Sequence, residues 1–113
     1  MKLAAEQINH AISGFTDVSE LSLSINHREG KYDMTLVLSN SKDEIVILKC
    51  QDVSNLRVSD FGGGLTQFMC LRSQDVSERQ LDRVCFQFVE LEKGAIAFHC
   101  ASAECSEDKI RSG

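Results

Sequence analysis

The sequence predicts an α+β protein that is mainly β. An N-terminal helix packs on a curved antiparallel meander sheet, or on an open barrel, of six to seven strands. Helical periodicity is confined to residues 2–13, and apolar and polar residues alternate through much of 19–101. The phrase Gln-Asp-Val-Ser occurs at 51–54 and again at 74–77. Each copy ends an apolar run, where Asp and Ser side chains can bond to their own backbone in a turn. We therefore expect a succession of short strands.

Length and composition limit the function classes. A chain of 113 residues corresponds to one domain, 1–113. Its net charge of −5 argues against a general affinity for nucleic acid. No apolar run approaches the ~18 residues of a membrane helix, and Glu6 and Gln7 interrupt any signal-peptide core. We expect a cytoplasmic protein with no membrane partner, whose five cysteines are reduced thiols.

The first elements are a helix and a hairpin. In residues 2–13 the apolar positions fall near one face, and Gly14 suits the C-terminal cap. Strict alternation then runs from 21 to 38 around a two-residue turn at 29–30. That register sets Leu23 opposite Leu36, with both side chains facing the core.

A second hairpin shares the strand that contains Leu36. A four-residue loop at 40–43 sets Leu36 opposite Ile47. Val46 and Leu48 then lie on the other face, which is apolar as well. We expect a helix or a second sheet to cover part of that face.

Weaker strand signals follow. One strand is expected over 53–61, with Leu56 and Val58 facing inward, and another over 65–71. The glycines at 62–64 separate the two strands.

The last hairpin has the clearest turn. A three-residue loop at 92–94 ends in glycine and fits a type I turn with a glycine bulge. This register sets Phe88 opposite Phe98. Residues 102–113 lack periodicity and are expected to form a polar tail.

No catalytic, metal or cofactor site emerges from the motifs. The glycines at 62–64 lack the lysine and the spacing of a phosphate-binding loop. His99, Cys100 and Cys105 lack paired metal-ligand spacing, and His99 and Cys100 point to opposite faces of a strand. Cysteines 50, 70, 85 and 100 lie in or beside apolar runs and fit small buried side chains, whereas Cys105 falls in the polar tail. We expect a protein that is not an enzyme and binds no cofactor or metal.

Acidic residues near the glycines form a candidate binding surface. Asp60, Phe61, Glu78 and Asp82 lie in or beside polar turns. Phe61 is either a core plug or an exposed anchor. If it is exposed, an aromatic ringed by carboxylates fits a basic protein partner.

Several short motifs resemble a known group of proteins over roughly residues 48–101. They are Gln51-Asp52-Val53-Ser54 with Leu56 and Val58, Asp60-Phe61-Gly62-Gly63-Gly64, Asp75-Val76-Ser77 with Gln80 and Asp82, and Phe98 with Cys100. The pattern is similar to small bacterial cytosolic immunity proteins of contact-dependent inhibition and related polymorphic toxin systems. The resemblance implies a non-enzymatic inhibitor that binds one toxin domain, often a nuclease. It carries over no binding residues, because such surfaces differ between toxin pairs.

The leading hypothesis is an immunity protein that binds and neutralises a cognate, basic toxin domain. Two other classes stay open: a β domain that binds a small molecule in the mouth of the curved sheet, and a small enzyme that uses a cysteine. The oligomeric state does not follow from the sequence.

Overall fold

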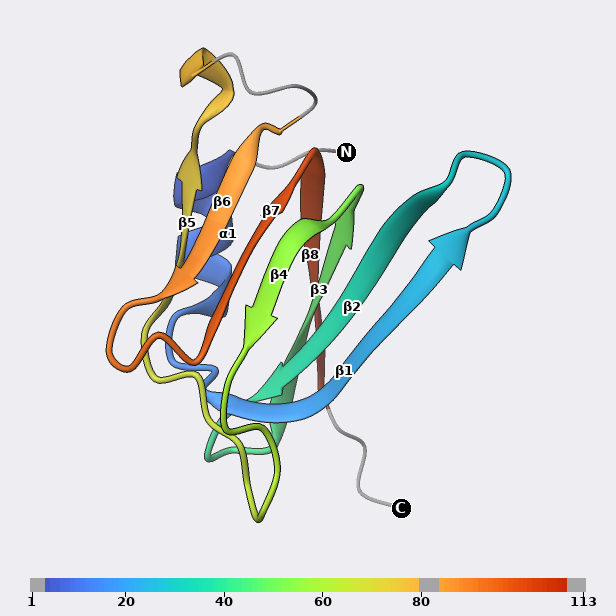
Figure 1. Cartoon of the computed structure of the whole chain (residues 1–113). Helices are drawn as coiled ribbons and strands as arrows, with labels where there is room; N and C mark the ends of the chain where they lie inside the picture. Colours follow the sequence, from blue (N-terminus) through green and yellow to red (C-terminus); the bar gives the residue numbers. More distant parts are fainter. Residues whose placement is uncertain (1–3, 80–83, 110–113) are drawn as a thin grey trace.

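The computed structural model describes residues 4–79 and 84–109, which form one helix and eight strands in two antiparallel sheets (Figure 1). The helix is α1 (Ala5–Ile12). The first sheet has the order β1 (Asp17–Asn26), β2 (Lys31–Ser39), β3 (Glu44–Gln51), β8 (Ser102–Lys109). The second has the order β4 (Ser54–Val58), β7 (Ile96–Cys100), β6 (Phe86–Glu90), β5 (Leu71–Asp75). A short 3₁₀ helix, η1 (Ser77–Arg79), follows β5. The predicted α+β, mainly β class is confirmed, and the sheets do not close into a barrel.

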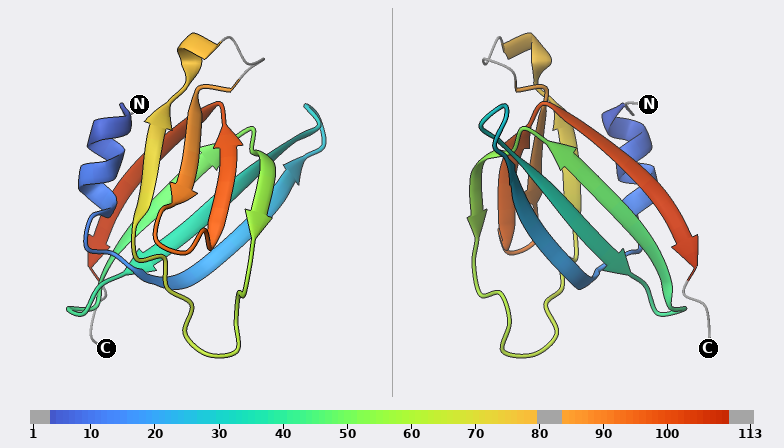
Figure 2. Two further views of the ribbon diagram at one scale, coloured as in Figure 1. Left: turned by 60° about the vertical axis from the view of Figure 1, so that its left-hand side comes forward. Right: turned by 90° about the vertical axis from the view of Figure 1, so that its right-hand side faces the viewer.

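The core lies between the two sheets, which face each other (Figure 2). The first sheet contributes Leu36 and Leu48, and the second contributes Phe88 and Phe98, all buried. The two phenylalanine rings stack with centroids 4.8 Å apart and planes within 7°. Inward residues alternate with outward ones along β2, β6 and β7, as a half-buried strand requires.

Over the residues that the structure describes, helix α1 confirms the helix predicted at 2–13. It does not lie on the face of one sheet. It packs beside β5 and β8, which are the edge strands on the same side of the two sheets (Figure 2). Ile8 and Ile12 enter the core. The Asn9 amide bonds with both backbone groups of Ser73, accepting its N–H at 2.7 Å and donating to its carbonyl at 3.0 Å. The helix thus closes one open side of the core and satisfies part of the β5 edge.

The last hairpin has the predicted register, with Phe88 opposite Phe98. The first hairpin differs by two residues, because Leu23 lies opposite Met34. Its loop spans four residues, since the Asn26 carbonyl accepts the Gly30 N–H at 2.7 Å. A shift of two leaves every side chain on its predicted face.

The second hairpin differs by one residue, which inverts the predicted faces. Leu36 lies opposite Leu48 rather than Ile47. The loop has three residues, 41–43, because the Asn40 N–H donates to the Glu44 carbonyl at 3.1 Å. Asp43 ends this loop at φ 61°, and the Asn40 side-chain oxygen accepts the N–H of Glu44 at 3.0 Å. Val46 and Leu48 are therefore fully buried.

Four further expectations are wrong. Residues 65–70 are a loop, and β5 begins only at Leu71. Val58 is exposed at the end of β4, although Leu56 packs on the core as predicted. Most of the predicted polar tail is strand β8, which pairs with β3 and buries Ala103. The sheet is also no simple meander, because β4 pairs with β7 and β3 with β8.

No helix within residues 4–79 and 84–109 has the length and apolar composition needed to cross a membrane.

Candidate partner-binding surface

Two connecting segments lie together at one end of the second sheet: residues 59–70, between β4 and β5, and residues 91–95, between β6 and β7 (Figure 2). The Ser59 N–H donates to the Ala95 carbonyl at 3.0 Å and joins them. We call the surface formed by these two segments the loop end.

The second half of segment 59–70 is anchored on the start of β1. The Val18 N–H donates to the Thr66 carbonyl at 2.9 Å, and the Phe68 N–H donates to the Thr16 carbonyl at 2.8 Å. The Phe68 side chain is buried. The aromatic core plug of this segment is therefore Phe68, and Phe61 is exposed, which resolves the alternative that the sequence left open.

The tip of the segment reverses direction through residues in the left-handed region. Asp60 has φ 56°, and the glycines at 62–64 have φ values between 70° and 124°. Glycine adopts such angles freely, which explains the run of three, and Asp is one of the few other residues that enter this region. The Gly62 N–H donates to the Thr66 hydroxyl at 2.8 Å and ties the tip to its anchored half.

Both segments of the loop end carry large apolar side chains that are exposed. Four of them are between 49% and 67% exposed: Phe61, Leu65, Met69 and Leu91. They come from both segments, and Leu91 lies 30 positions after Phe61 in the sequence. Leu65 and Met69 line one pocket with Asp60, and exposed apolar residues that share a fixed surface are typical of protein interaction sites.

The Glu90 side chain holds the two segments of the loop end together. Its carboxylate is buried and accepts backbone N–H groups of Lys93 at 2.7 Å, Glu92 at 3.0 Å, Cys70 at 3.1 Å and Ala95 at 3.3 Å. Burial raises the pKa of the Glu90 carboxyl, but these donors outweigh burial and hold that pKa below its ordinary value. An ionised Glu90 therefore holds the turn at 91–95 to segment 59–70.

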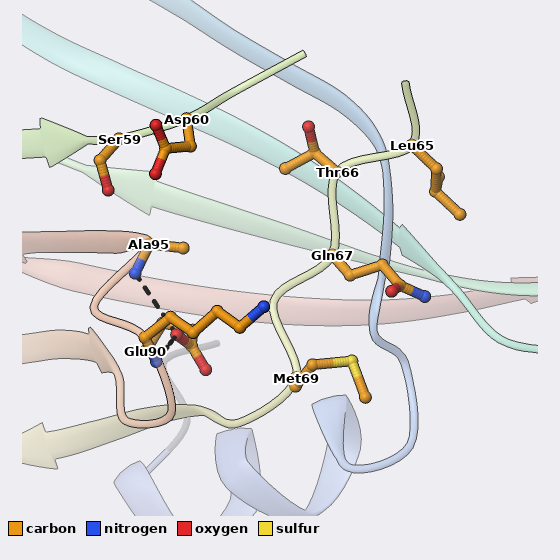
Figure 3. Close-up of a pocket in the computed structure, with 9 residues that line it drawn as sticks. Ser59, Asp60, Leu65, Thr66, Gln67, Met69, Glu90 and Ala95 are labelled. Carbon is orange, nitrogen blue, oxygen red and sulfur yellow. Dashed lines mark hydrogen bonds between the residues drawn. The ribbon is translucent and has the colours of Figure 1, made fainter. Parts of the chain in front are cut away.

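A small pocket of about 250 Å³ opens between the two segments. Figure 3 shows Glu90 and Ala95 on one side, Asp60 and Ser59 at the rim, and Thr66 and Gln67 across from them. It is smaller than the ~300–1,000 Å³ of typical small-molecule sites, and most of its lining residues are polar. The pocket therefore adds no support for a small-molecule binder.

The structure describes three of the four predicted site residues and brings two of them together. Asp60 and Phe61 are neighbours at the loop end. Glu78 is exposed in η1, beyond the far end of β5, so it lies at the opposite end of the second sheet (Figure 1). Asp82 lies outside the described residues.

Asp75 acts as a turn cap, as the phrase Gln-Asp-Val-Ser predicts. Its carboxylate accepts the hydroxyl of Ser77 at 2.6 Å and the N–H of Ser77 at 2.9 Å, and these bonds lower its pKa.

Sequence reasoning missed Glu90 and the apolar members of the loop end. Glu90 follows Phe86 and Phe88 at period two, so its inward direction could have been foreseen. Leu65 and Met69 were assigned to a strand, and their exposure depends on the loop that replaces it.

Among the described residues, no cluster of three or more His, Cys, Asp or Glu side chains could hold a metal. All five cysteines are thiols. A hydrogen bond with Cys100, together with burial, raises the pKa of Cys50 well above its ordinary value, which disfavours the reactive thiolate. His99 bonds through Nδ1 to the Asn55 amide at 3.2 Å. Cys105 is half-buried on β8 rather than in a tail.

Comparison with known proteins identifies one family. The model of the family described as Immunity protein PIM8 matches residues 5–106. No curated protein and no solved structure matches the chain.

Proposed function

The chain belongs to the Immunity protein PIM8 family, and from this premise we propose that it neutralises a cognate toxin domain by binding it, without catalysis, through the loop end. The observation that carries the choice of surface is that the two segments of the loop end expose four large apolar side chains, one of them next to Asp60 in the sequence. The loop end and the match share the same part of the chain, since residues 59–70 and 91–95 fall within 5–106.

The loop end is built in a way that favours tight binding. The buried Phe68 side chain anchors the loop end in the core, and the Glu90 carboxylate binds backbone N–H groups of both segments. A surface that is already ordered loses less conformational entropy when it binds. Phe61 and Leu65 can then act as apolar anchors, which slow dissociation once water is excluded around them.

The charge of the chain favours a basic partner. The net charge is −5, and Asp60 stands directly beside Phe61. Carboxylates at the rim of an interface accelerate encounter with a cationic protein. A toxin domain that acts on nucleic acid must attract phosphates with Lys and Arg, so a nuclease has the complementary surface. We therefore favour a nuclease as the target.

The proposed surface is narrower than the one expected from the sequence. Asp60 and Phe61 remain in it, together with Leu65, Met69 and Leu91. Glu78 is too distant to share a compact patch with them, which makes it a useful control position. The five thiols fit a reducing compartment, and we propose that the protein acts in the cytoplasm.

The test is a titration against the toxin domain encoded beside the gene of this protein. Residual toxin activity is measured while the immunity chain is added in known molar ratios. A binding inhibitor abolishes activity at a fixed stoichiometric ratio. Neutralisation far below that ratio would indicate catalytic inactivation, and full toxin activity in excess chain would overturn the function.

A further inference from the structure

The two sheets have four edge strands, and three of them are protected against pairing with another chain. Beside β5 and β8 lies α1. Strand β4 is short and irregular, with a register shift after Ser54 and φ 53° at Asn55. Strand β1 has ten residues, and its outer edge faces no described strand beyond its first residues. A long open edge offers unpaired N–H and C=O groups to another chain.

The open part of this edge has defined ends. At its start, Val18 bonds to Thr66 and a bulge separates Val18 from Glu20. At its other end the strand stops at Asn26, where the turn begins. The open span is therefore Glu20–Asn26, and its midpoint is Leu23. It contains no proline or lysine, the residues that commonly block edge pairing.

Peptide groups along this span alternate between the two sides of the strand. The Asn26 carbonyl points toward β2, since it accepts the Gly30 N–H in the turn. The groups of residues 21, 23 and 25 therefore point outward. Each of these residues presents one N–H and one C=O at the open edge.

The side chains at the same positions are apolar and incompletely covered. Leu21, Leu23 and Ile25 lie on the inner face of the first sheet, opposite Leu36, Met34 and Tyr32. This part of β1 and β2 extends beyond the second sheet (Figure 1). Leu23, Ile25 and Tyr32 are consequently between 39% and 49% exposed.

We propose that the open edge binds a second copy of this chain, with the two β1 strands antiparallel and Leu23 opposite Leu23. This register uses the whole open span. It sets Leu21 opposite Ile25, Ser22 opposite Ser24, and Glu20 opposite Asn26, so apolar meets apolar and no charge meets a like charge. The pairs formed by residues 21, 23 and 25 exchange backbone hydrogen bonds. The two first sheets become one continuous eight-stranded sheet, twice the four strands of each copy.

The same register explains why a second copy fits better than an unrelated strand. Ser22-Leu23-Ser24 reads the same in both directions, with Leu21 and Ile25 on either side of it. A two-fold axis through Leu23 therefore gives each side chain from 21 to 25 a partner of its own kind, and the contacts are reciprocal, as in an isologous interface. Each copy carries −5, so salt should strengthen this association by screening repulsion.

Sedimentation of the full chain over a series of concentrations tests the proposal. We expect a monomer–dimer equilibrium that shifts toward dimer at higher salt. Leu23→Lys places two ammonium groups directly opposite each other and should weaken dimerisation by about tenfold or more. Ser24→Lys adds the same charge on the same strand but opposite Ser22, and should change the equilibrium much less. A chain that stays monomeric at all concentrations, or equal effects of the two variants, overturns the proposal.

A second pair of variants keeps the register testable if Leu23→Lys unfolds. Leu23→Cys should form a dimer linked by a disulfide under mild oxidation, because its side chain faces its own copy. Ser24→Cys is equally on the surface but faces Ser22, and should cross-link much more slowly. The unmodified chain controls for its own five thiols. Cross-linking that is no faster at position 23 than at 24 overturns the self-opposed register.

Discussion

The carboxylate of Glu90 accepts a hydrogen bond from the backbone N–H of Cys70 at 3.1 Å, across 20 residues of sequence. The same side chain accepts three N–H groups of its own turn. One buried anion therefore shapes both segments of the loop end. Because one carboxylate binds N–H groups of both segments, the ionised side chain couples local stability to the geometry of the candidate binding surface.

Glu90→Gln should lower the free energy of unfolding by about 1–3 kcal/mol, because an amide NH₂ cannot accept the N–H groups that the carboxylate accepts. Glu92→Gln is the matched control, since Glu92 is exposed in the same turn. Chemical denaturation of both variants measures the difference. Equal stability of the two variants would contradict the supporting role of Glu90.

The pH dependence follows from the lowered pKa of Glu90. A carboxyl whose folded pKa lies below its unfolded value stabilises the fold fully above the ordinary value of 4.5. This stabilisation is lost as pH falls from there through the folded pKa. Glu90→Gln should therefore show a shallower loss of stability below pH 4.5 than the unmodified chain. Denaturation curves at a series of acidic pH values check this, and parallel losses in both proteins would contradict it.

Leu36→Ala should cost about 2–5 kcal/mol, because Leu36 is fully buried between the sheets. Leu23→Ala should cost less than about 1 kcal/mol, since Leu23 is 43% exposed. Denaturation at concentrations that keep the chain monomeric compares them, with Ser24→Ala as the neutral reference. A large loss for Leu23→Ala would show that the distal half of β1 is covered in solution.

The success of each strand prediction depended on what determines its register. The hairpin at Phe88 and Phe98 was predicted in register, because a short loop ending in Gly94 determines it locally. The pairing of Leu36 was off by one, since the left-handed conformation of Asp43 is not evident from residue type. Strand β8 was missed, because its pairing with β3 is long-range and its residues are mostly polar.

The candidate site was partly predictable for a related reason. Asp60 and Phe61 are adjacent in sequence beside three glycines, so local composition was enough to select them. Leu91 and Glu90 reach the loop end only through the pairing of β5 with β6, which sets Leu71 opposite Glu90. The same pairing carries Glu78 to the other end of the sheet. Acidic residues that lie in similar polar turns of the sequence therefore do not all lie close together in the structure.

Thiol labelling of the native chain should divide the cysteines by burial. Cys50 and Cys100 are buried, and Cys50 has a raised pKa, so both should react last. Cysteines 70, 85 and 105 are partly exposed and should react first. Mass spectrometry at successive labelling times gives the order. Early modification of Cys50, or an intramolecular disulfide in the purified protein, would contradict this assignment.

Binding of the toxin domain should be sensitive to Phe61 and Asp60 but not to Glu78. Phe61→Ala should raise the dissociation rate constant by about thirtyfold, as expected for the loss of an anchor worth roughly 2 kcal/mol. Because Phe61 is 52% exposed, the melting temperature should hardly change. Asp60→Lys should mainly lower the association rate constant and flatten its salt dependence, since it reverses a charge at the rim.

Glu78→Lys makes the same change in net charge at the opposite end of the second sheet, so it separates a local effect from a global one. Binding kinetics at several salt concentrations compare it with Asp60→Lys. A local interface at the loop end requires Asp60→Lys to have the larger effect on association. If both reversals slow association equally, net charge alone steers the toxin. If Phe61→Ala also leaves dissociation unchanged, the loop end is not the surface that binds the toxin, although the chain remains a member of an immunity family.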